Sequence, residues 1–488
     1  MVQELEQAEE PVAADGKVCE VVSLGIPSSF HCDQHAPGVS SSQKKISMEF
    51  GKHIGKAVWA FADKALPAIY GVGFIWLVIR KLPPAEYGAY VLVQLFFIVL
   101  FTLGQSFALQ PLLKYAAEGR NTNTYLTISS ILYLLFCFVT SGALWICKDI
   151  ASGILNTPEL GKLMIYVPAL LAASAFRNIV IVLLQANFRI RELFVIDAAY
   201  FLGALVLLGV ASHFDLMRTA NDALDINVLA FLVSSLLAMI PSWSLLKFSV
   251  AEIRNTLKDM REFATFSLSN SAGYMVSAQL DTLLISMYWG PIQVASYNAA
   301  KVFYRAIEIV AQVIQMFLIP AASRLSAQKR INDLKALFEK TTLFSHVLLF
   351  VMACGLIAFA PFLFHFFYHD KYDEAIKILQ ILALASLGVP WLAACASVMT
   401  GAGEVRLLFR NVVALFGISL VCYLVLIPIS NIEGAAWGFA VSQIASAFMF
   451  ARTLHSSGLV EVSSLKIMSR FTDIWIFIKK NLKFGPNS

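Results

Sequence analysis

Charged residues are scarce in this chain: Asp, Glu, Lys and Arg make up 14% of its 488 residues, whereas 58% are hydrophobic. A water-soluble protein of this length could not cover so much apolar side chain with polar surface. The composition therefore excludes a soluble globular fold and indicates a lipid bilayer as the solvent. The net charge of +5 is divided among short groups along the chain, so no nucleic-acid partner is expected.

The short motifs of common catalytic sites are absent. The chain has no Walker A sequence, no GxGxxG, no HExxH and no candidate Ser-His-Asp triad. Its seven cysteines form no CxxC and are expected to be packing residues. His365 and His369 have a spacing that can bind a metal, but the aromatic run around them favours an interfacial belt. We expect no enzyme activity, no metal site and no cofactor.

Long apolar segments are abundant instead. A membrane-spanning helix needs roughly 20 apolar residues. Twelve segments qualify, at about 57–79, 88–112, 124–147, 162–187, 193–211, 226–248, 263–288, 294–322, 340–367, 375–400, 406–429 and 434–456. The predicted fold class is all-α, a polytopic membrane protein with about 12 transmembrane helices in two pseudo-symmetric six-helix bundles around a central cavity.

The domain organisation follows from these segments and from composition. Residues 1–46 are acidic and predict a disordered tail. The predicted bundles are 47–250 and 263–458, joined by a short charged cytoplasmic connector at 251–262. The tail 459–488 contains an amphipathic stretch, 464–480, which is typical of an interfacial helix.

Basic residues gather before the first span and after each even-numbered span. Lys247, Arg254, Lys258 and Arg261, for example, follow the sixth span, whereas the loop 212–225 holds three Asp and one Arg. The positive-inside rule therefore predicts that both termini are cytoplasmic.

One sequence pattern occurs twice, 207 residues apart. Residues 80–94 read RKLPPAEYGAYVLVQ, and residues 287–301 read MYWGPIQVASYNAAK. The matched residues are Pro84 and Pro291, Gly88 and Ala295, and Tyr90 and Tyr297. Each copy follows one apolar segment and opens the next. A membrane protein built from two related halves is usually a transporter, because two bundles that move about a shared site give alternating access.

Polar residues recur at steps of three and four along the seventh and eighth segments, so each set shares one helix face. With a shift of 207, Asp63 overlays Asn270 and Gln94 overlays Lys301. Polar groups in lipid are costly and mark a bundle interior or a water-filled path, although such groups can also simply hold helices together. The residues expected to line a substrate cavity are Lys64, Gln94, Arg177, Asn270, Tyr274, Lys301, Arg305 and Gln312.

Three interpretations of the charges stay open. Asp281 and Lys301 lie at similar depth, roughly 13–15 Å from the turn at 290–291, so they are expected to pair and to be structural. Lys301, Arg305 and Arg177 could instead hold an anionic substrate such as a diphosphate. The carboxylates could carry a coupling H⁺ or Na⁺ or form ion pairs, and this set is Asp63, Asp281 and Glu308.

Several stretches resemble a known family. LVIRKLPPAEYGAYVLV resembles the signature R-x-L-G-P-x-E-Y-G-x-Y that follows the first span of bacterial polysaccharide transporters, the O-antigen and exopolysaccharide flippases. QLDTLLISMYWGPIQVASYNAAK resembles the pattern of spans seven and eight, in which Asp281 matches the family's Asp. IPAASRL, TGAGEVRL and EGAAWGFAVSQ also fit, so the resemblance covers about 50–458. Pro83 and Ala295 depart from the pattern, since each replaces a Gly.

The resemblance implies membership of the superfamily that also holds the lipid II flippase and the multidrug-and-toxin extruders. It implies alternating access and transfer of an undecaprenyl-diphosphate-linked oligosaccharide from the inner to the outer leaflet of the bacterial inner membrane, with a polysaccharide polymerase and chain-length machinery as further partners. The alternatives are a cation or drug antiporter of the same superfamily and a membrane polymerase or ligase. The short loops argue against the latter, because they leave no room for an extramembrane catalytic domain.

Overall fold

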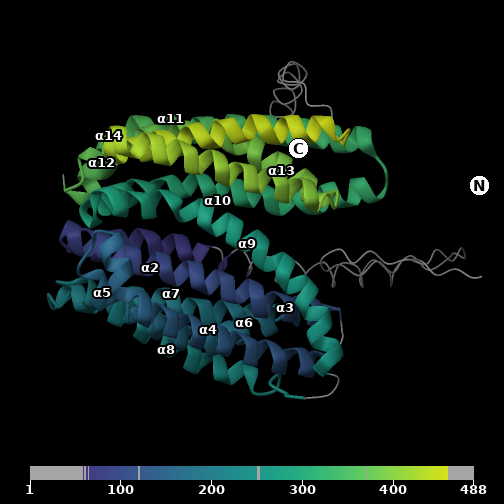
Figure 1. Cartoon of the computed structure of the whole chain (residues 1–488), viewed down its shortest axis with the longest axis horizontal. Helices are drawn as coiled ribbons and strands as arrows, with labels where there is room; N and C mark the ends of the chain where they lie inside the picture. The colour runs from purple at the N-terminus through teal and green to yellow at the C-terminus, as the bar shows by residue number, and fades with distance from the viewer. Residues whose placement is uncertain are drawn as a thin grey trace, which may run out of the picture. The chain divides into compact units, whose positions relative to one another are not determined.

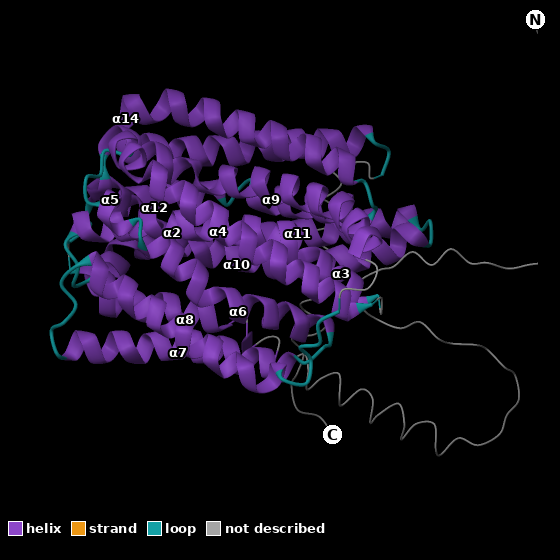
Figure 2. Cartoon of the chain, turned by 60° about the horizontal axis from the view of Figure 1, so that its bottom comes forward, coloured by secondary structure: helices purple, strands orange, loops and turns teal. Residues whose placement is uncertain are grey.

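The computed structural model describes residues 59, 62–63, 65–118, 121–249, 253–369 and 371–459. Within these ranges the regular structure is entirely helical (Figures 1 and 2). The predicted tail helix at 464–480 and the acidic residues 1–46 lie outside the described residues.

The first half of the chain contains six spans. The first is an apolar helix, Ala65–Ile79, that ends in the π-helical turn η1. The remaining elements are α2 (Pro84–Gly104), η2 (Gln105–Leu109), α3 (Gln110–Ala117), α4 (Thr122–Ile154), α5 (Leu160–Leu163), α6 (Tyr166–Ala186), α7 (Ile190–His213) and α8 (Ala220–Ser242). The elements α2, η2 and α3 together form one continuous span, Pro84–Ala116.

The second half is built from longer helices. Its elements are α9 (Ile253–Trp289), α10 (Pro291–Ala327), α11 (Ile331–Tyr368), α12 (Glu374–Ala385), α13 (Val389–Gly401) and α14 (Val405–Ser456). The pair α12 and α13 is bent by 44° and serves as a single span. Helix α14 is two spans joined at Ser430 and Asn431, whose backbone is not helical.

Across the described residues, helices lie at each of the twelve predicted positions, and the all-α membrane fold is confirmed. By length and composition alone, eight of the described helices could cross a membrane, or nine if the bent pair is one span; Ala65–Ile79 is shorter, α9 is not among them, and α14 counts once although it holds two spans. We call one end of the helices the outer end, following the charge distribution. It holds the connections at 80–83, 155–159, 214–219, 290 and 430–431 and the connection between α11 and α12.

Helices α2 and α10 form the main contact between the halves, and they carry the two copies of the repeated pattern. Each begins with proline at its first position, Pro84 or Pro291, where the missing N–H costs no hydrogen bond. A Cβ atom on Gly88 would lie only 1.8 Å from the carbonyl oxygen of Pro291. Only glycine therefore permits this backbone approach, which explains the residue's place in the pattern.

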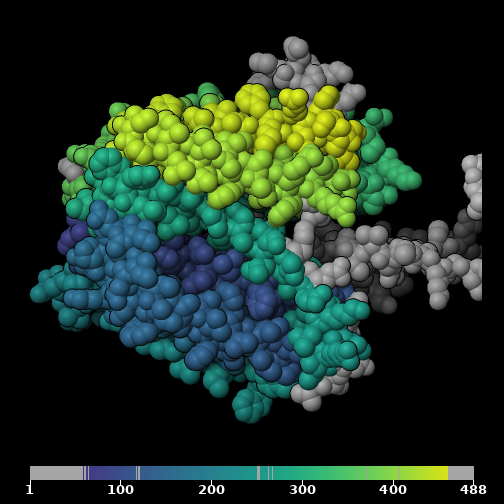
Figure 3. All heavy atoms as spheres, in the orientation of Figure 1, coloured from purple at the N-terminus to yellow at the C-terminus, as the bar shows by residue number. Residues whose placement is uncertain are grey.

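Helix α9 begins at Ile253, inside the segment predicted to be a connector. The segment lacks Pro and Gly, so nothing in it interrupts the helix. Near its start, Asp259 accepts hydrogen bonds from Tyr115 to its carbonyl oxygen (3.1 Å) and from Tyr125 to its carboxylate (3.3 Å). The helix thus runs from the first half to the second, and in Figure 3 its teal atoms cross between the blue and the green surfaces.

Candidate functional site

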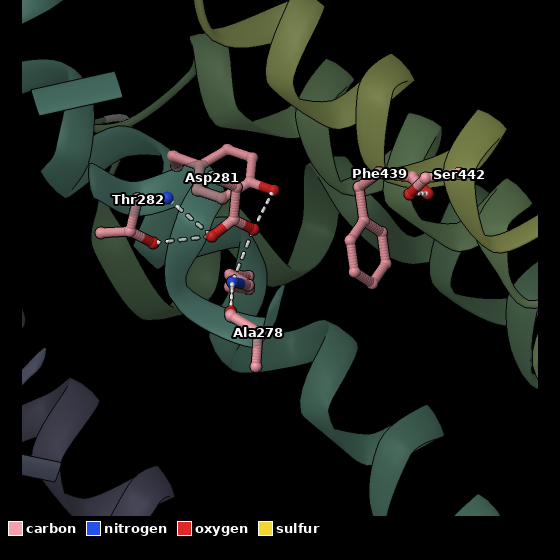
Figure 4. A network of polar contacts seen from close by, with 7 residues as sticks. Ala278, Asp281, Thr282, Phe439 and Ser442 are labelled. Carbon is pink, nitrogen blue, oxygen red and sulfur yellow. Dashed lines mark hydrogen bonds and ion pairs between the residues drawn. The ribbon is translucent and has the colours of Figure 1, made fainter. Parts of the chain in front are cut away.

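Asp281 and Lys301 form the buried ion pair that their equal depth predicts. The ammonium of Lys301 donates to Oδ2 of Asp281 at 2.7 Å and to the carbonyl oxygen of Ala278 at 3.3 Å (Figure 4). The hydroxyl of Tyr297 donates to the same Oδ2 at 2.8 Å. The repeated tyrosine thus connects α10 to α9.

The second oxygen of Asp281 is also occupied. Its Oδ1 accepts from the backbone N–H of Thr282 at 2.6 Å and from the Thr282 hydroxyl at 3.1 Å (Figure 4). The Asp281 side chain is 1% exposed and that of Lys301 13%. A buried carboxylate needs such partners, because losing one of them would leave an uncompensated buried charge. In this conformation neither charge is available to another partner.

Other predicted site residues lie on the exposed face of the same two helices. Arg305 and Gln312 of α10 are exposed, and Glu308 between them is half-buried. On α9, Asn270 and Tyr274 are exposed, the latter at 57%. Five polar side chains near the middle of two membrane-spanning helices therefore remain accessible.

Arg305 carries the positive charge of this face. Among the residues that the structure describes, it has no ion-pair partner, and its guanidinium acts electrostatically on the hydroxyls of Tyr87 in α2 and Tyr368 in α11. Tyr87 belongs to the first half, so Arg305 lies near the boundary between halves. It stands roughly 21 Å along α10 from Pro291, deep within the membrane.

Glu308 supplies the opposite charge on the same face. It acts electrostatically on the hydroxyls of Tyr274 in α9 and Tyr304 in α10. Arg305 and Glu308 are three residues apart but form no ion pair in the described structure. The face can therefore offer both an anion-binding group and a titratable carboxyl.

Arg177 lies in the interior of the first half instead of on this face. Its guanidinium pairs with Asp197 of α7, and its Nε donates to the Ser234 hydroxyl of α8 at 3.0 Å. It also lies over the rings of Tyr200 and Phe231, at 5.3 and 5.7 Å from their centroids. Asp197 was not predicted from the sequence, where its only signal is a lone carboxylate within an apolar segment.

Gln94 takes part in a separate polar network of the first half. Its amide donates to the hydroxyl of Tyr90 at 3.1 Å, and that hydroxyl also accepts from the amide of Asn227 at 3.1 Å. The hydroxyls of Tyr70 and Tyr200 donate to the Asn227 carbonyl oxygen at 3.2 and 3.3 Å. Asn227 of α8, which was also not predicted from the sequence, thus connects four helices.

The remaining predicted residues are at the start of the first span. Asp63 is buried, at 7% exposed, whereas Lys64 lies outside the described residues. Within the described ranges, no group of three or more His, Cys, Asp or Glu side chains is arranged to hold a metal ion. The imidazole of His369 lies 2.9 Å from the guanidinium of Arg80.

Comparison with solved structures identifies the fold. The fold resembles that of a lipid II flippase, MurJ, in an inward closed conformation, with a TM-score of 0.67 and 14% identity over 89% of this chain and 94% of the other. It also resembles a multidrug resistance MATE family transporter of the MOP superfamily in an inward-facing conformation, with a TM-score of 0.66 and 14% identity over 81% of this chain and 95% of the other. The fold is that of the MOP-superfamily transporters.

Sequence comparison then identifies the family. A family profile described as polysaccharide biosynthesis protein matches residues 77–377, and the chain belongs to that family. An uncharacterized membrane protein of Methanocaldococcus jannaschii is 24% identical over 373 residues, which span 74% of this chain and 78% of the relative. The protein is therefore a multi-pass membrane protein of this polysaccharide biosynthesis family, and its fold matches those of MurJ and a MATE transporter.

Proposed function

We propose that this protein is a flippase for a polyprenyl-diphosphate-linked oligosaccharide. It would move the undecaprenyl-linked repeat unit from the cytoplasmic to the outer leaflet of the bacterial inner membrane by alternating access, with both termini cytoplasmic. The product would serve O-antigen, capsule or exopolysaccharide synthesis, with a polymerase and chain-length machinery acting on it afterwards. Family membership and the fold shared with a lipid II flippase support this proposal.

The observation that carries the proposal is the exposed Arg305 between the halves. A guanidinium deep in a membrane protein is costly unless it has a function or a partner. The other cations predicted for this site are already neutralised where the structure describes them, Lys301 by Asp281 and Arg177 by Asp197. Arg305 therefore offers the charge that a diphosphate needs, since its planar fork suits phosphate oxygens.

Glu308 is our candidate for coupling to an ion gradient. Asp281 is committed to Lys301 and Tyr297, whereas Glu308 is half-buried on the face that holds Arg305. Protonation of Glu308 would remove the negative charge next to Arg305 and so favour an anionic substrate. Sodium at the same carboxylate is the alternative coupling ion.

Mass spectrometry of lipid-linked saccharides in a deletion strain, with a leaflet-accessibility probe, tests the function. We expect one complete repeat unit to accumulate as its polyprenyl diphosphate on the cytoplasmic side. A normal lipid-linked pool would contradict the proposal. A unit that reaches the outer leaflet but stays unpolymerised would point to a polymerase or ligase, which the family and fold disfavour.

A cation or drug antiporter is the second candidate, because the fold matches a MATE transporter almost as well as the lipid II flippase. Such a protein needs a binding face dominated by carboxylates. Here the face carries one exposed cation, Arg305, and one half-buried carboxylate, Glu308, so carboxylates do not dominate it. Altered sensitivity of the deletion strain to cationic drugs, with normal lipid-linked saccharides, would favour the antiporter.

A further inference from the structure

Lys371, in the connection between α11 and α12, reaches from the second half to the end of the first span. Its ammonium donates to the carbonyl oxygens of Ile79 at 3.2 Å and Arg80 at 3.3 Å, and also to that of Leu82. These three carbonyls belong to the last turn of the first span and to the link that follows η1. A single side chain of the second half therefore caps the C-terminal end of a helix in the first half.

The contact satisfies groups that the helix cannot satisfy itself. The last carbonyls of a helix have no partner within it, and the negative end of the helix dipole favours a cation there. Lys371 is half-buried in this position, and burial lowers the pKa of its amine. If the Lys371 side chain moved away, water would hydrate its ammonium again, and the three carbonyls would lose their hydrogen bonds to it.

The neighbouring contacts of Lys371 also join the two halves. The Arg80 guanidinium lies 2.9 Å from the His369 imidazole. The rings of Tyr87 and Tyr372 meet edge to face, with centroids 6.4 Å apart. The first span, α2 and the connection between α11 and α12 are thus held together at the outer end.

Two other lysines at this end bind only within their own halves. Lys81 donates to the Ser212 carbonyl oxygen at 2.5 Å and lies 3.7 Å from the Asp215 carboxylate, both in the first half. Lys377 pairs with Glu433 at 2.8 Å, both in the second half. These lysines are matched controls, because neither contact has to break when the halves separate.

We propose that Lys371 is a latch that holds the outer end closed. The outer end opens only when the Lys371 ammonium leaves the carbonyls of the first span. Any movement that separates the first span from the connection between α11 and α12 must break these three hydrogen bonds together. The latch acts on the conformational equilibrium of the protein whatever its substrate is, and so it is tested separately from the flippase proposal.

Spin labels on opposite halves of the outer end test the latch. Leu216 of the first half and Ile429 of the second are exposed, at 62% and 74%, and would be replaced by cysteine in a cysteine-free full-length chain. Distances are measured by electron double resonance in nanodiscs. We expect Lys371→Met to raise the ratio of open to closed molecules by roughly tenfold, as for the loss of a charge-assisted hydrogen bond. Lys81→Met and Lys377→Met should keep the wild-type distribution.

A distance distribution for Lys371→Met that matches the wild type would overturn the latch, as would an equal shift in Lys377→Met. Lys371→Arg keeps the charge and several donors, so it should remain mostly closed. If Lys371→Met does not fold, comparison of Lys371→Arg with Lys371→Gln decides instead. The neutral, shorter glutamine should shift the distribution to longer distances, and the absence of any difference between the two would contradict the proposal.

Discussion

At the scale of single residues, charged side chains that look equivalent in the sequence differ in whether they have an ion-pair partner. Lys301 and Arg305 are one helical turn apart on α10, yet Lys301 is bound to Asp281, and Arg305 is exposed with no ion-pair partner among the described residues. Removing each side chain should therefore have a different effect. Loss of the Lys301 side chain should lower the stability of the protein, and loss of the Arg305 side chain should lower the rate of transport.

Arg305→Ala should lower transport of the lipid-linked substrate by about 10- to 100-fold, which corresponds to the ~1.5–3 kcal/mol of a charged hydrogen bond. The substitution removes an exposed side chain, so the thermal unfolding temperature should stay close to the wild type. Reconstituted vesicles and a leaflet probe measure the rate. Arg330→Ala, at an exposed arginine whose neighbour is Asp333, is the control, and full activity of Arg305→Ala would exclude a binding role.

Lys301→Ala should destabilise the protein, because it leaves the Asp281 carboxylate buried without a cation. Breaking a buried pair in this way costs about 3–5 kcal/mol. Thermal unfolding in detergent measures the loss. Lys301→Ala combined with Asp281→Asn removes both charges and should regain much of the stability. A single variant as stable as the wild type would show that the pair contributes nothing to the fold.

At the scale of elements, the crossing of α2 and α10 decides how closely the halves meet. The two copies of the repeated pattern lie against one another, with Gly88 on the carbonyl of Pro291. The equivalent position of the second copy is Ala295, which is fully buried. The crossing is therefore asymmetric, with the close approach provided by one glycine.

Gly88→Ala should weaken this crossing by about 1–3 kcal/mol, the usual cost of forcing an extra methyl group into a packed site. Spin-label distances across the outer end should then lengthen. Gly142→Ala is the matched control, because a Cβ there would meet nothing within 4 Å. If the spin-label distances in Gly88→Ala match the wild type, α10 can shift away from α2 without opening the outer end.

At the scale of the whole molecule, Lys371 makes closure of the outer end sensitive to pH. Burial lowers its pKa in the closed state, whereas an exposed lysine titrates near 10.4. The closed state thus binds this proton less tightly than an open state does, because the neutral amine still donates to the carbonyls and avoids the cost of burying a charge. The closed fraction should rise with pH between the lowered pKa and about 10.4, and be independent of this group below that window. Arg80, His369 and Tyr372 are the charged and polar neighbours in the described structure.

Spin-label distances measured from neutral to alkaline pH check this dependence. Lys371→Met should remove the rise, and Lys377→Met should retain it. A closed fraction that falls as the pH increases would contradict the sign. If the closed fraction rises with pH to the same extent in Lys371→Met, another group causes the pH dependence.

The sequence by itself determined the features that depend on local composition and period. Apolar length fixed the spans, because each helix must cross the same hydrocarbon thickness. The repeated pattern predicted two related halves, and equal depth along neighbouring helices predicted the pairing of Asp281 with Lys301. Each of these inferences needs only the position of a residue along its own helix.

Only the tertiary structure decided which charges are neutralised and which contacts join the halves. The partner of Arg177 is Asp197 on the next helix, and Lys371 binds a carbonyl 289 residues away in the chain. Such contacts depend on how each helix is rotated and at what angle it crosses its neighbour. Those quantities are set by the packing of all the side chains together, and no periodicity within one helix contains them.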